Sequence, residues 1–151
     1  MADREGLLVI SECAAVRSEY YLSLCIAQIV TRCSLDGFSE ELLENHLAAV
    51  TELYSRDNNH ASVVMWSLAN EPRSFRPEAG PYFREVAARL RGLDPTRPLT
   101  AIMYDHGDNV TDFAAPHVDI LGVNKYIGWY TDTGHLEAVP SQLEASLRQW
   151  R

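Results

Sequence analysis

The feature that most constrains the fold is a set of short apolar runs that alternate with helical patterns. The clearest run covers residues 62–68, Ser-Val-Val-Met-Trp-Ser-Leu, and is apolar almost throughout. A strand of that composition is covered on both faces, which is typical of a parallel sheet flanked by helices. We expect three further strands, at residues 6–10, 99–103 and 118–124.

Helical patterns occupy the segments between these strands. Ser39 fits an N-cap, and Glu40 and Glu41 follow in the first turn, where the helix dipole favours negative charge. The apolar face predicted for this helix consists of Leu43, Leu47, Val50 and Tyr54.

Two more helices are predicted downstream. One lies between Pro77 and Gly92, with an apolar stripe made of Tyr82, Val86 and Leu90. A short irregular or helical piece is expected at residues 108–115. The last helix begins at Pro140, and its inward side chains are predicted to be Leu143, Leu147 and Trp150.

Strand–helix alternation at this spacing implies an α/β fold with right-handed crossovers. The 151 residues hold about four βα units, whereas a closed (β/α)8 TIM barrel has eight strands and typically about 250 residues. We therefore predict that residues 1–151 form part of one (β/α)8 barrel. A complete doubly wound domain is the alternative, but no glycine-rich phosphate loop supports it. Residues 17–35 lack clean periodicity and are predicted to form a divergent loop.

Composition excludes several kinds of partner. The net charge of −8 argues against nucleic acid, because phosphate binding needs a clustered basic surface. The apolar segment at residues 20–30 is too short to span a membrane. Cys13, Cys25 and Cys33 have no metal-ligand spacing, which favours buried thiols over a metal site; a Cys25–Cys33 disulfide stays open.

Polar side chains follow three of the expected strands. Ser11-Glu12 comes after the first, Asn70-Glu71 after the second, and Asn124-Lys125 at the end of the fourth. Singly, Glu12 also fits a solvated loop acid, Asn70-Glu71 a cap of the following segment, and Asn124-Lys125 an ordinary loop start. Functional side chains of parallel βα folds gather at the carboxyl ends of strands, so their joint occurrence favours a site there.

Two segments give this arrangement a family. Asp57-Asn58-Asn59-His60, the apolar strand with Trp66, and the ending Asn70-Glu71-Pro72 resemble the acid–base signature of glycoside hydrolase family 2. Residues 124–130, Asn-Lys-Tyr-Ile-Gly-Trp-Tyr, and residues 134–137, Gly-His-Leu-Glu, resemble the β-glucuronidases of that family more than its β-galactosidases or β-mannosidases.

The resemblance implies a retaining exo-glycosidase that removes terminal β-D-glucuronic acid from glucuronides or glycosaminoglycans, with no metal or other cofactor. By position, Glu71 is the general acid/base and Asn70 binds the sugar 2-hydroxyl. Asn124, Tyr126 and Tyr130 line the family's substrate pocket, with Tyr126 beside the nucleophile. The family also implies a homo-oligomer, a tetramer.

The sequence departs from the family pattern in two respects. The family's nucleophile is a Glu in a later Glu-Tyr-Gly segment, which does not occur in these 151 residues. We therefore expect a fragment that covers about barrel strands three to six, carries no nucleophile and has no appreciable hydrolase activity alone. In addition, Ser11 stands where members commonly have an acidic residue.

Other readings stay open at this point. The chain could be a non-catalytic truncated product that acts as a sugar-binding or interaction module, or a piece of a related β-galactosidase or β-mannosidase. Relatives in animals are lysosomal or secreted and bacterial ones are often cytoplasmic, so the compartment is not decided. Asn109 lies in an N-glycosylation sequon, which matters only for a secreted chain.

Overall fold

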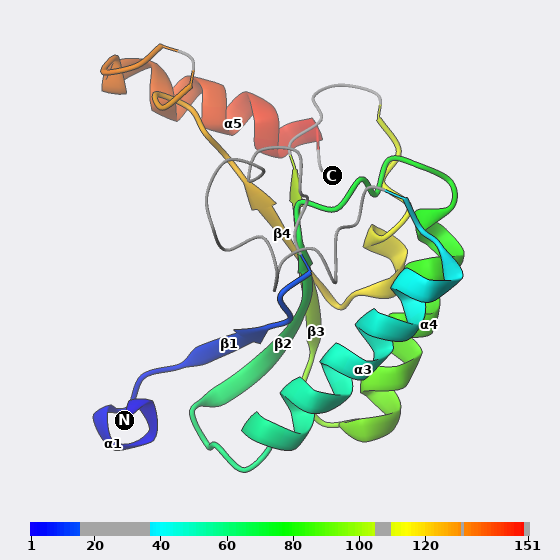
Figure 1. Cartoon of the computed structure of the whole chain (residues 1–151). Helices are drawn as coiled ribbons and strands as arrows, with labels where there is room; N and C mark the ends of the chain where they lie inside the picture. Colours follow the sequence, from blue (N-terminus) through cyan, green and yellow to red (C-terminus); the bar gives the residue numbers. More distant parts are fainter. Residues whose placement is uncertain (16–36, 105–109, 131, 150–151) are drawn as a thin grey trace, which may run out of the picture.

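A four-stranded parallel sheet forms the centre of the protein (Figure 1). The computed structural model describes residues 1–15, 37–104, 110–130 and 132–149. The strands are β1 (Val9–Glu12), β2 (Val63–Asn70), β3 (Leu99–Tyr104) and β4 (Ile120–Asn124), and they lie side by side in that order. Each neighbouring pair is parallel, which confirms the predicted sheet.

The strand order distinguishes the two folds that the sequence allowed. In a doubly wound domain the strand order reverses at a switch point and helices cover both faces of the sheet. Here every crossover advances the sheet by one strand in the same direction, and helices α3 and α4 lie on the same side of it (Figure 1). This is the winding of a (β/α)8 barrel. The partial barrel is confirmed, and the doubly wound alternative is wrong.

Helix α3 (Glu40–Asp57) begins where the cap residue predicts. The Ser39 hydroxyl oxygen accepts a hydrogen bond from the backbone N–H of Leu42 at 3.2 Å. The buried side chains are Leu42, His46, Val50 and Leu53. Of the predicted apolar face, Val50 is buried, and Leu43, Leu47 and Tyr54 are partly buried and pack against the core. The centre of the contact surface lies one position earlier, at a buried histidine and two leucines.

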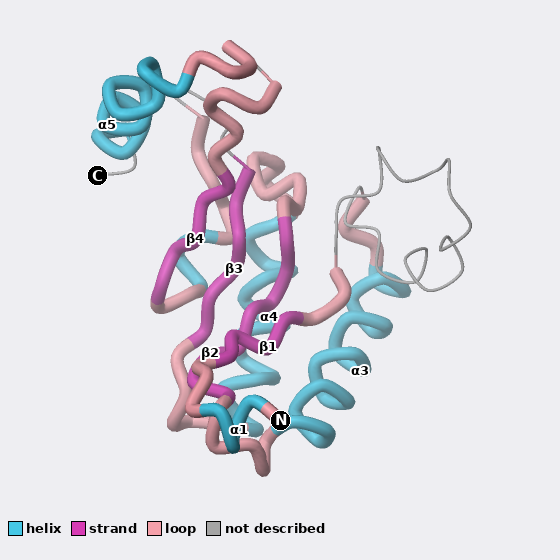
Figure 2. The backbone as a smooth tube through the Cα atoms, turned by 90° about the vertical axis from the view of Figure 1, so that its left-hand side faces the viewer, coloured by secondary structure: helices cyan, strands magenta, loops and turns pink. Residues whose placement is uncertain are grey.

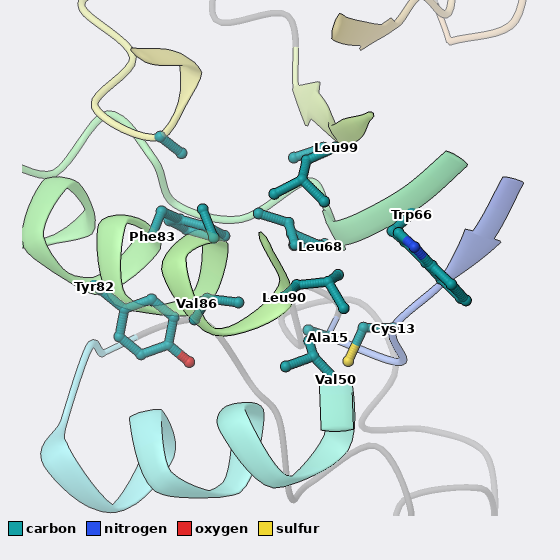
Figure 3. Packing of buried hydrophobic residues seen from close by; sticks show 14 of the residues in the cluster. Cys13, Ala15, Val50, Trp66, Leu68, Tyr82, Phe83, Val86, Leu90 and Leu99 are labelled. Carbon is teal, nitrogen blue, oxygen red and sulfur yellow. The ribbon is translucent and has the colours of Figure 1, made fainter. Parts of the chain in front are cut away.

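Helix α4 (Ala79–Leu93) packs beside α3 and completes the core. Its predicted stripe is confirmed, since Tyr82, Val86 and Leu90 are all buried, but Gly92 lies inside the helix rather than closing it. Figure 3 shows these side chains converging with Val50 of α3 on strand residues such as Leu68. The helical face of the sheet is consequently a continuous apolar core.

The opposite face of the sheet is more open. Side chains alternate between the two faces of a strand. Because Ser11 is buried on the side of α3, the preceding residue, Ile10, lies on the other face. Ile10 is 51% exposed, and Ile120 at the far edge is 47% exposed. This inner face is therefore exposed at the two edge strands, whereas Ser67 and Thr100 on the same face of the central strands are buried.

The start of the chain differs from the prediction. Residues Ala2–Glu5 form a short helix, α1, which ends at Gly6 with a left-handed φ of 67°. Strand β1 therefore begins at Val9, not at Gly6. The glycine that suggested a strand start is instead the C-cap of a helix, which the apolar pattern did not indicate.

The last helix, α5 (Val139–Gln149), projects beyond the sheet. Figures 1 and 2 place it near the end of the sheet opposite α1. Its predicted inward face is wrong at Leu147, which is 52% exposed, because no described element packs over it. Two short 3-10 turns, η2 (Ala115–His117) and η3 (Leu136–Ala138), precede β4 and α5.

Some predictions concern residues outside the described ranges. These are the loop predicted at residues 17–35, the sequon at Asn109, the thiols of Cys25 and Cys33, and the inward side chain of Trp150. The third cysteine, Cys13, is described and is buried in the core.

None of the described helices combines the length and the apolar character needed to cross a membrane.

A polar cluster anchors β2 at the end of the sheet away from its carboxyl edge. The buried carboxylate of Asp94 accepts hydrogen bonds from Trp66 Nε1 at 3.0 Å and from Arg97 at 2.8 Å. The Arg97 guanidinium also lies 5.4 Å from the centroid of the Trp66 ring. Burial raises the pKa of Asp94, but hydrogen bonds from Thr96, Trp66 and Arg97 outweigh it and hold the pKa well below its ordinary value.

Replacing Asp94 with asparagine should therefore destabilise the fold. We expect Asp94→Asn to lower the free energy of unfolding by about 2–4 kcal/mol at pH 7, because Arg97 loses its charged partner. A lowered folded-state pKa contributes stability above the unfolded-state pKa of about 3.9, and this contribution is lost as the pH falls. The difference between wild type and variant, measured by urea unfolding, should thus shrink progressively below about pH 4.

The matched control is Glu137→Gln, which alters an acid that is 75% exposed. We expect it to change stability by less than about 0.5 kcal/mol. An Asp94→Asn difference that stays constant from pH 7 to pH 3 would contradict the account of this cluster.

Candidate active site

Four of the five side chains expected to form the site meet at the carboxyl edge of the sheet. Asn124, the last residue of β4, donates from Nδ2 to Oδ1 of Asn70 at 3.1 Å and to Oε1 of Glu71 at 2.7 Å. The hydroxyl of Tyr126 donates to the same Oε1 of Glu71 and lies 3.2 Å from Nδ2 of Asn124. The contacts span β3, which lies between β2 and β4.

An irregularity in β2 makes this meeting possible. Trp66 and Leu68 face the helices, so regular alternation would send Asn70 to the same side. The register between β2 and β3 shifts instead: Ser67 pairs with Thr100, but Asn70 pairs with Ile102. Three residues of β2 thus oppose two of β3, as in a β-bulge, and the shift reverses the direction of the following side chains.

Glu71 itself lies in an uncommon backbone conformation. Its φ is +50°, in the left-handed region that residues other than glycine seldom adopt. Such a conformation costs on the order of 1–3 kcal/mol and persists where surrounding contacts hold it. The strain turns the chain out of the strand immediately after Asn70.

Backbone and loop contacts hold this turn. The N–H of Glu71 donates to the carbonyl of Ile102 at 2.7 Å, and the N–H of Asn70 donates to that of Ala15 at 3.0 Å. In the following loop, the buried Ser74 hydroxyl donates to the Asp112 carboxylate. The segment is therefore fixed on both sides.

Asn124 lies on the face of β4 that points away from the helices, and close packing of β3 against β4 accompanies this placement. A Cβ atom at Gly122 would lie 2.5 Å from Cδ1 of Ile102, so the absence of a side chain lets Ile102 lie over β4. Ile102 alternates with core residues Ala101 and Met103 and therefore faces away from the helices. Asn124, two residues after Gly122, shares that face.

The amide of Asn124 fixes the orientation of its neighbour. Because the carbonyl oxygen of Asn70 accepts from Asn124, the NH2 group of Asn70 is directed elsewhere and can donate to a ligand. Both hydrogen bonds to Glu71 end on Oε1. The second oxygen, Oε2, is therefore the atom of Glu71 suited to exchange a proton.

Two tyrosines complete the cluster. Burial, followed by the hydrogen bond to Glu71, raises the pKa of Tyr126 from its ordinary value of about 10 to about 12, so the phenol keeps its proton. Its ring packs edge-on against Tyr130, with ring centroids 5.0 Å apart. Tyr130 is 73% exposed and forms the outer side of the cluster. The structure thus pairs Tyr126 with the candidate acid/base, a contact not indicated by the sequence.

The other polar groups at strand ends have different neighbours. The buried Ser11 faces α3 and donates to the Asp57 carboxylate at 2.6 Å, so it is not part of the site. Glu12 faces the open side and accepts from the Ser67 hydroxyl at 2.8 Å. Lys125 contacts the Ser146 hydroxyl of α5.

Within the described residues, no group of three or more His, Cys, Asp or Glu side chains could hold a metal ion. The assembled groups are instead a carboxyl, two amides and a phenol at the carboxyl edge of parallel barrel strands. These groups suit a class of chemistry in which a carboxylic acid transfers a proton while amides bind a hydroxylated ligand.

Comparison with known proteins makes the class specific. The chain belongs to the family described as Glycosyl hydrolases family 2, TIM barrel domain, which matches residues 1–151. It is 40% identical to a β-glucuronidase of Rattus norvegicus and 42% identical to one of Paenibacillus borealis, in each case over 150 residues and 99% of this chain. The chain spans only 21% and 24% of the lengths of those relatives.

Solved structures agree with the sequence comparison. The β-D-glucuronidase of Dictyoglomus thermophilum superposes with a TM-score of 0.79 at 38% identity, and the match covers 99% of this chain and 25% of that one. A β-glucuronidase of an uncultured Clostridium species gives a TM-score of 0.80 at 35% identity, with 99% and 24% covered. The similarity therefore extends to the arrangement of the described elements.

The sequence indicated the residues of the cluster but not their mutual contacts. No proline or glycine marks the irregularity before Asn70, so the apolar run gave no signal of it. The Ser74–Asp112 contact joins two loops whose sequences carry no shared motif. The spacing of Asn124 and Tyr126 after β4 was the one signal that could have suggested a joint contact with Glu71.

The raised pKa of Tyr126 can be measured directly. With 13C-labelled tyrosine, the resonance that disappears in Tyr126→Phe should titrate in the wild type with a midpoint near pH 12. Because the folded state holds this proton more tightly than the unfolded state, the associated stability is present below about pH 10 and is lost as the pH rises towards 12. A midpoint near 10 would contradict the buried contact with Glu71.

Proposed function

We propose that this chain supplies the acid/base half of a retaining β-glucuronidase active site, with Glu71 as the general acid/base. The observation that carries the proposal is the asymmetric environment of the Glu71 carboxyl group. Two donors, from Asn124 and Tyr126, hold Oε1, and Oε2 is left for proton transfer. This arrangement fixes the carboxyl group without blocking its reactive oxygen.

The first chemical step needs a proton on the departing oxygen. Oε2 of Glu71 carries that proton and transfers it to the glycosidic oxygen while a nucleophilic carboxylate attacks the anomeric carbon and the glycosidic bond breaks. In the second step the Glu71 carboxylate removes a proton from water, which attacks the anomeric carbon and releases the nucleophile. The sugar leaves with its original configuration.

Asn70 provides selective binding during these steps. Its NH2 group, oriented by the bond from Asn124 to its carbonyl oxygen, donates to the sugar 2-hydroxyl. Such a bond strengthens as the ring acquires oxocarbenium character, so it stabilises the transition state more than the bound substrate. Tyr126 and Tyr130 contribute the adjoining wall of the pocket.

The nucleophile belongs, under this proposal, to a residue outside these 151. Retaining glycosidases hold their two carboxyl groups about 5–5.5 Å apart. In the family that the sequence resembles, the nucleophile is a Glu in a Glu-Tyr-Gly segment, and no such segment occurs in these 151 residues. The proposed activity is accordingly that of the whole protein encoded by the gene.

Glucuronides are the proposed substrates because of the relatives. The similar curated proteins are β-glucuronidases, and a Ruminococcus gnavus β-glucuronidase with a TM-score of 0.79 was solved in complex with uronic isofagomine. Residues 124–130, which set the resemblance apart from β-galactosidases and β-mannosidases, include three of the five proposed site residues.

Removing the carboxyl group of Glu71 should slow hydrolysis and make it responsive to an added nucleophile. In the protein as its gene encodes it, we expect Glu71→Ala to lower kcat for an aryl β-glucuronide by about 10²–10⁴-fold, the range typical of acid–base groups. Azide needs no general base, so it should restore turnover and give the β-glucuronosyl azide. Steady-state kinetics and product analysis measure both effects.

The control is Glu44→Gln, which alters an exposed acid on α3, on the opposite side of the sheet from Glu71, and should leave kcat within about twofold of wild type. Two results would oppose the proposal. One is a Glu71→Ala protein with normal kcat; the other is a wild-type protein that cleaves β-galactosides or β-mannosides but not β-glucuronides.

A further inference from the structure

A histidine with no access to solvent lies behind the site. His46 of α3 is 0% exposed and is enclosed between α3, α4 and β2. Its ring lies near those of Tyr82 and Phe83 of α4, with ring centroids 5.7 and 6.3 Å away. Because burying an imidazole costs free energy unless its nitrogens are hydrogen-bonded, the partners of this ring are informative.

Both ring nitrogens have partners. Nε2 lies 2.9 Å from the backbone carbonyl oxygen of Leu68, and Nδ1 lies 3.0 Å from the hydroxyl of Tyr82. Figure 3 shows Tyr82 extending from α4 towards α3. A carbonyl oxygen can only accept, so Nε2 carries the hydrogen and Nδ1 is the accepting nitrogen. The Tyr82 hydroxyl donates to Nδ1 at 3.0 Å, and the carbonyl oxygen of Leu42 lies farther from it, at 3.4 Å. Desolvation lowers the pKa of His46 to about 4 against the opposing effect of the Leu68 bond, so the ring is neutral at physiological pH.

The position of Leu68 gives this bond its significance. Leu68 lies within the irregular segment between Ser67 and Asn70, where β2 shifts its register against β3. The carbonyl held by His46 therefore belongs to the segment that reverses the direction of Asn70 and leads into the left-handed Glu71. Backbone bonds to Ala15, after β1, and to Ile102, in β3, hold this segment from its two flanking strands, and the His46 ring holds it from the helical side.

We infer that His46, oriented by Tyr82, is a positioning residue that holds the irregular end of β2 and thereby sets the geometry of Asn70 and Glu71. This inference rests on the proposed function for its kinetic consequences, but its structural part does not. His46 touches neither substrate nor the reacting atoms. It acts through the Leu68 carbonyl, two residues before Asn70.

A packing role and a positioning role make different demands on the side chain. A core filler needs only volume, and leucine would supply it. A positioning residue needs a donor aimed at Leu68 O, which glutamine can provide through its terminal NH2 at about the place of Nε2. His46→Leu and His46→Gln therefore separate the two roles, and Tyr82→Phe removes the orienting hydroxyl while it keeps the ring.

The first readout is amide-resolved hydrogen exchange in the protein as its gene encodes it. We expect His46→Leu to raise exchange at the Asn70 and Glu71 amides by about tenfold or more, since local opening is measured residue by residue. Exchange at the neighbouring Ala101 and Met103 should change by less than threefold. His46→Gln should return the rates towards wild type, and Tyr82→Phe should shift them in the same direction as His46→Leu by a smaller factor.

The second readout compares leaving groups. A misplaced Glu71 matters most for an alkyl β-glucuronide, whose departing oxygen needs the proton, and least for a dinitrophenyl β-glucuronide, whose phenolate leaves unaided. For His46→Leu we expect kcat/KM to fall by about 10²-fold for the alkyl substrate, the scale of loss that an ångström of displacement can cause. The loss for the dinitrophenyl substrate should be under fivefold.

Four results would overturn the inference about His46. In the exchange experiment they are unchanged rates at Asn70 and Glu71, rates raised equally across the domain, and no rescue by glutamine. In the kinetic experiment it is an equal loss for both substrates. If His46→Leu does not fold, Tyr82→Phe and His46→Gln carry the comparison. A wild-type protein without activity on either glucuronide would refute the proposed function, and the exchange data would still decide the role of His46.

Discussion

The site depends on the register shift between Ser67 and Asn70 in β2. Without it, Asn70 would share the helical face with Trp66 and Leu68 and would be buried in the core. The shift brings Asn70 to the open face, and the left-handed backbone of Glu71 then directs the carboxyl group towards Asn124 and Tyr126. The irregularity weakens β2 locally, but it allows side chains at the end of β2 to form hydrogen bonds with Asn124 of β4.

The rest of the fold supplies the free energy and rigidity that this irregularity needs. The apolar core between the sheet and helices α3 and α4 fixes β2 along most of its length, and the Trp66–Asp94–Arg97 cluster anchors its beginning. At its end, bonds to Ala15, Ile102 and His46 fix the turn. Because the strained residue is surrounded by such contacts, its conformation can persist without a ligand.

The sequence was informative where a repeating pattern or a cap determines structure. Alternating apolar runs predicted all four strands, and Ser39 predicted the start of α3, because these depend on neighbouring residues. Contacts between distant segments were not predictable: the bulge before Asn70 has no local signal, and Leu147 lies exposed although its helical spacing suggested an inward face. Family resemblance indicated Glu71 and its partners, whereas the hydrogen bonds between them are seen only in the folded structure.

The most direct test of the central claim is a crystal structure of the protein, as its gene encodes it, with a non-hydrolysable β-glucuronide. We expect Oε2 of Glu71 to lie about 2.6–3.2 Å from the glycosidic oxygen or its substitute, the range for proton transfer. We also expect the Asn70 NH2 group to contact the 2-hydroxyl while Asn124 still bonds to Oε1. A sugar bound with Glu71 out of reach of the glycosidic oxygen, or with Oε1 facing it, would contradict the account.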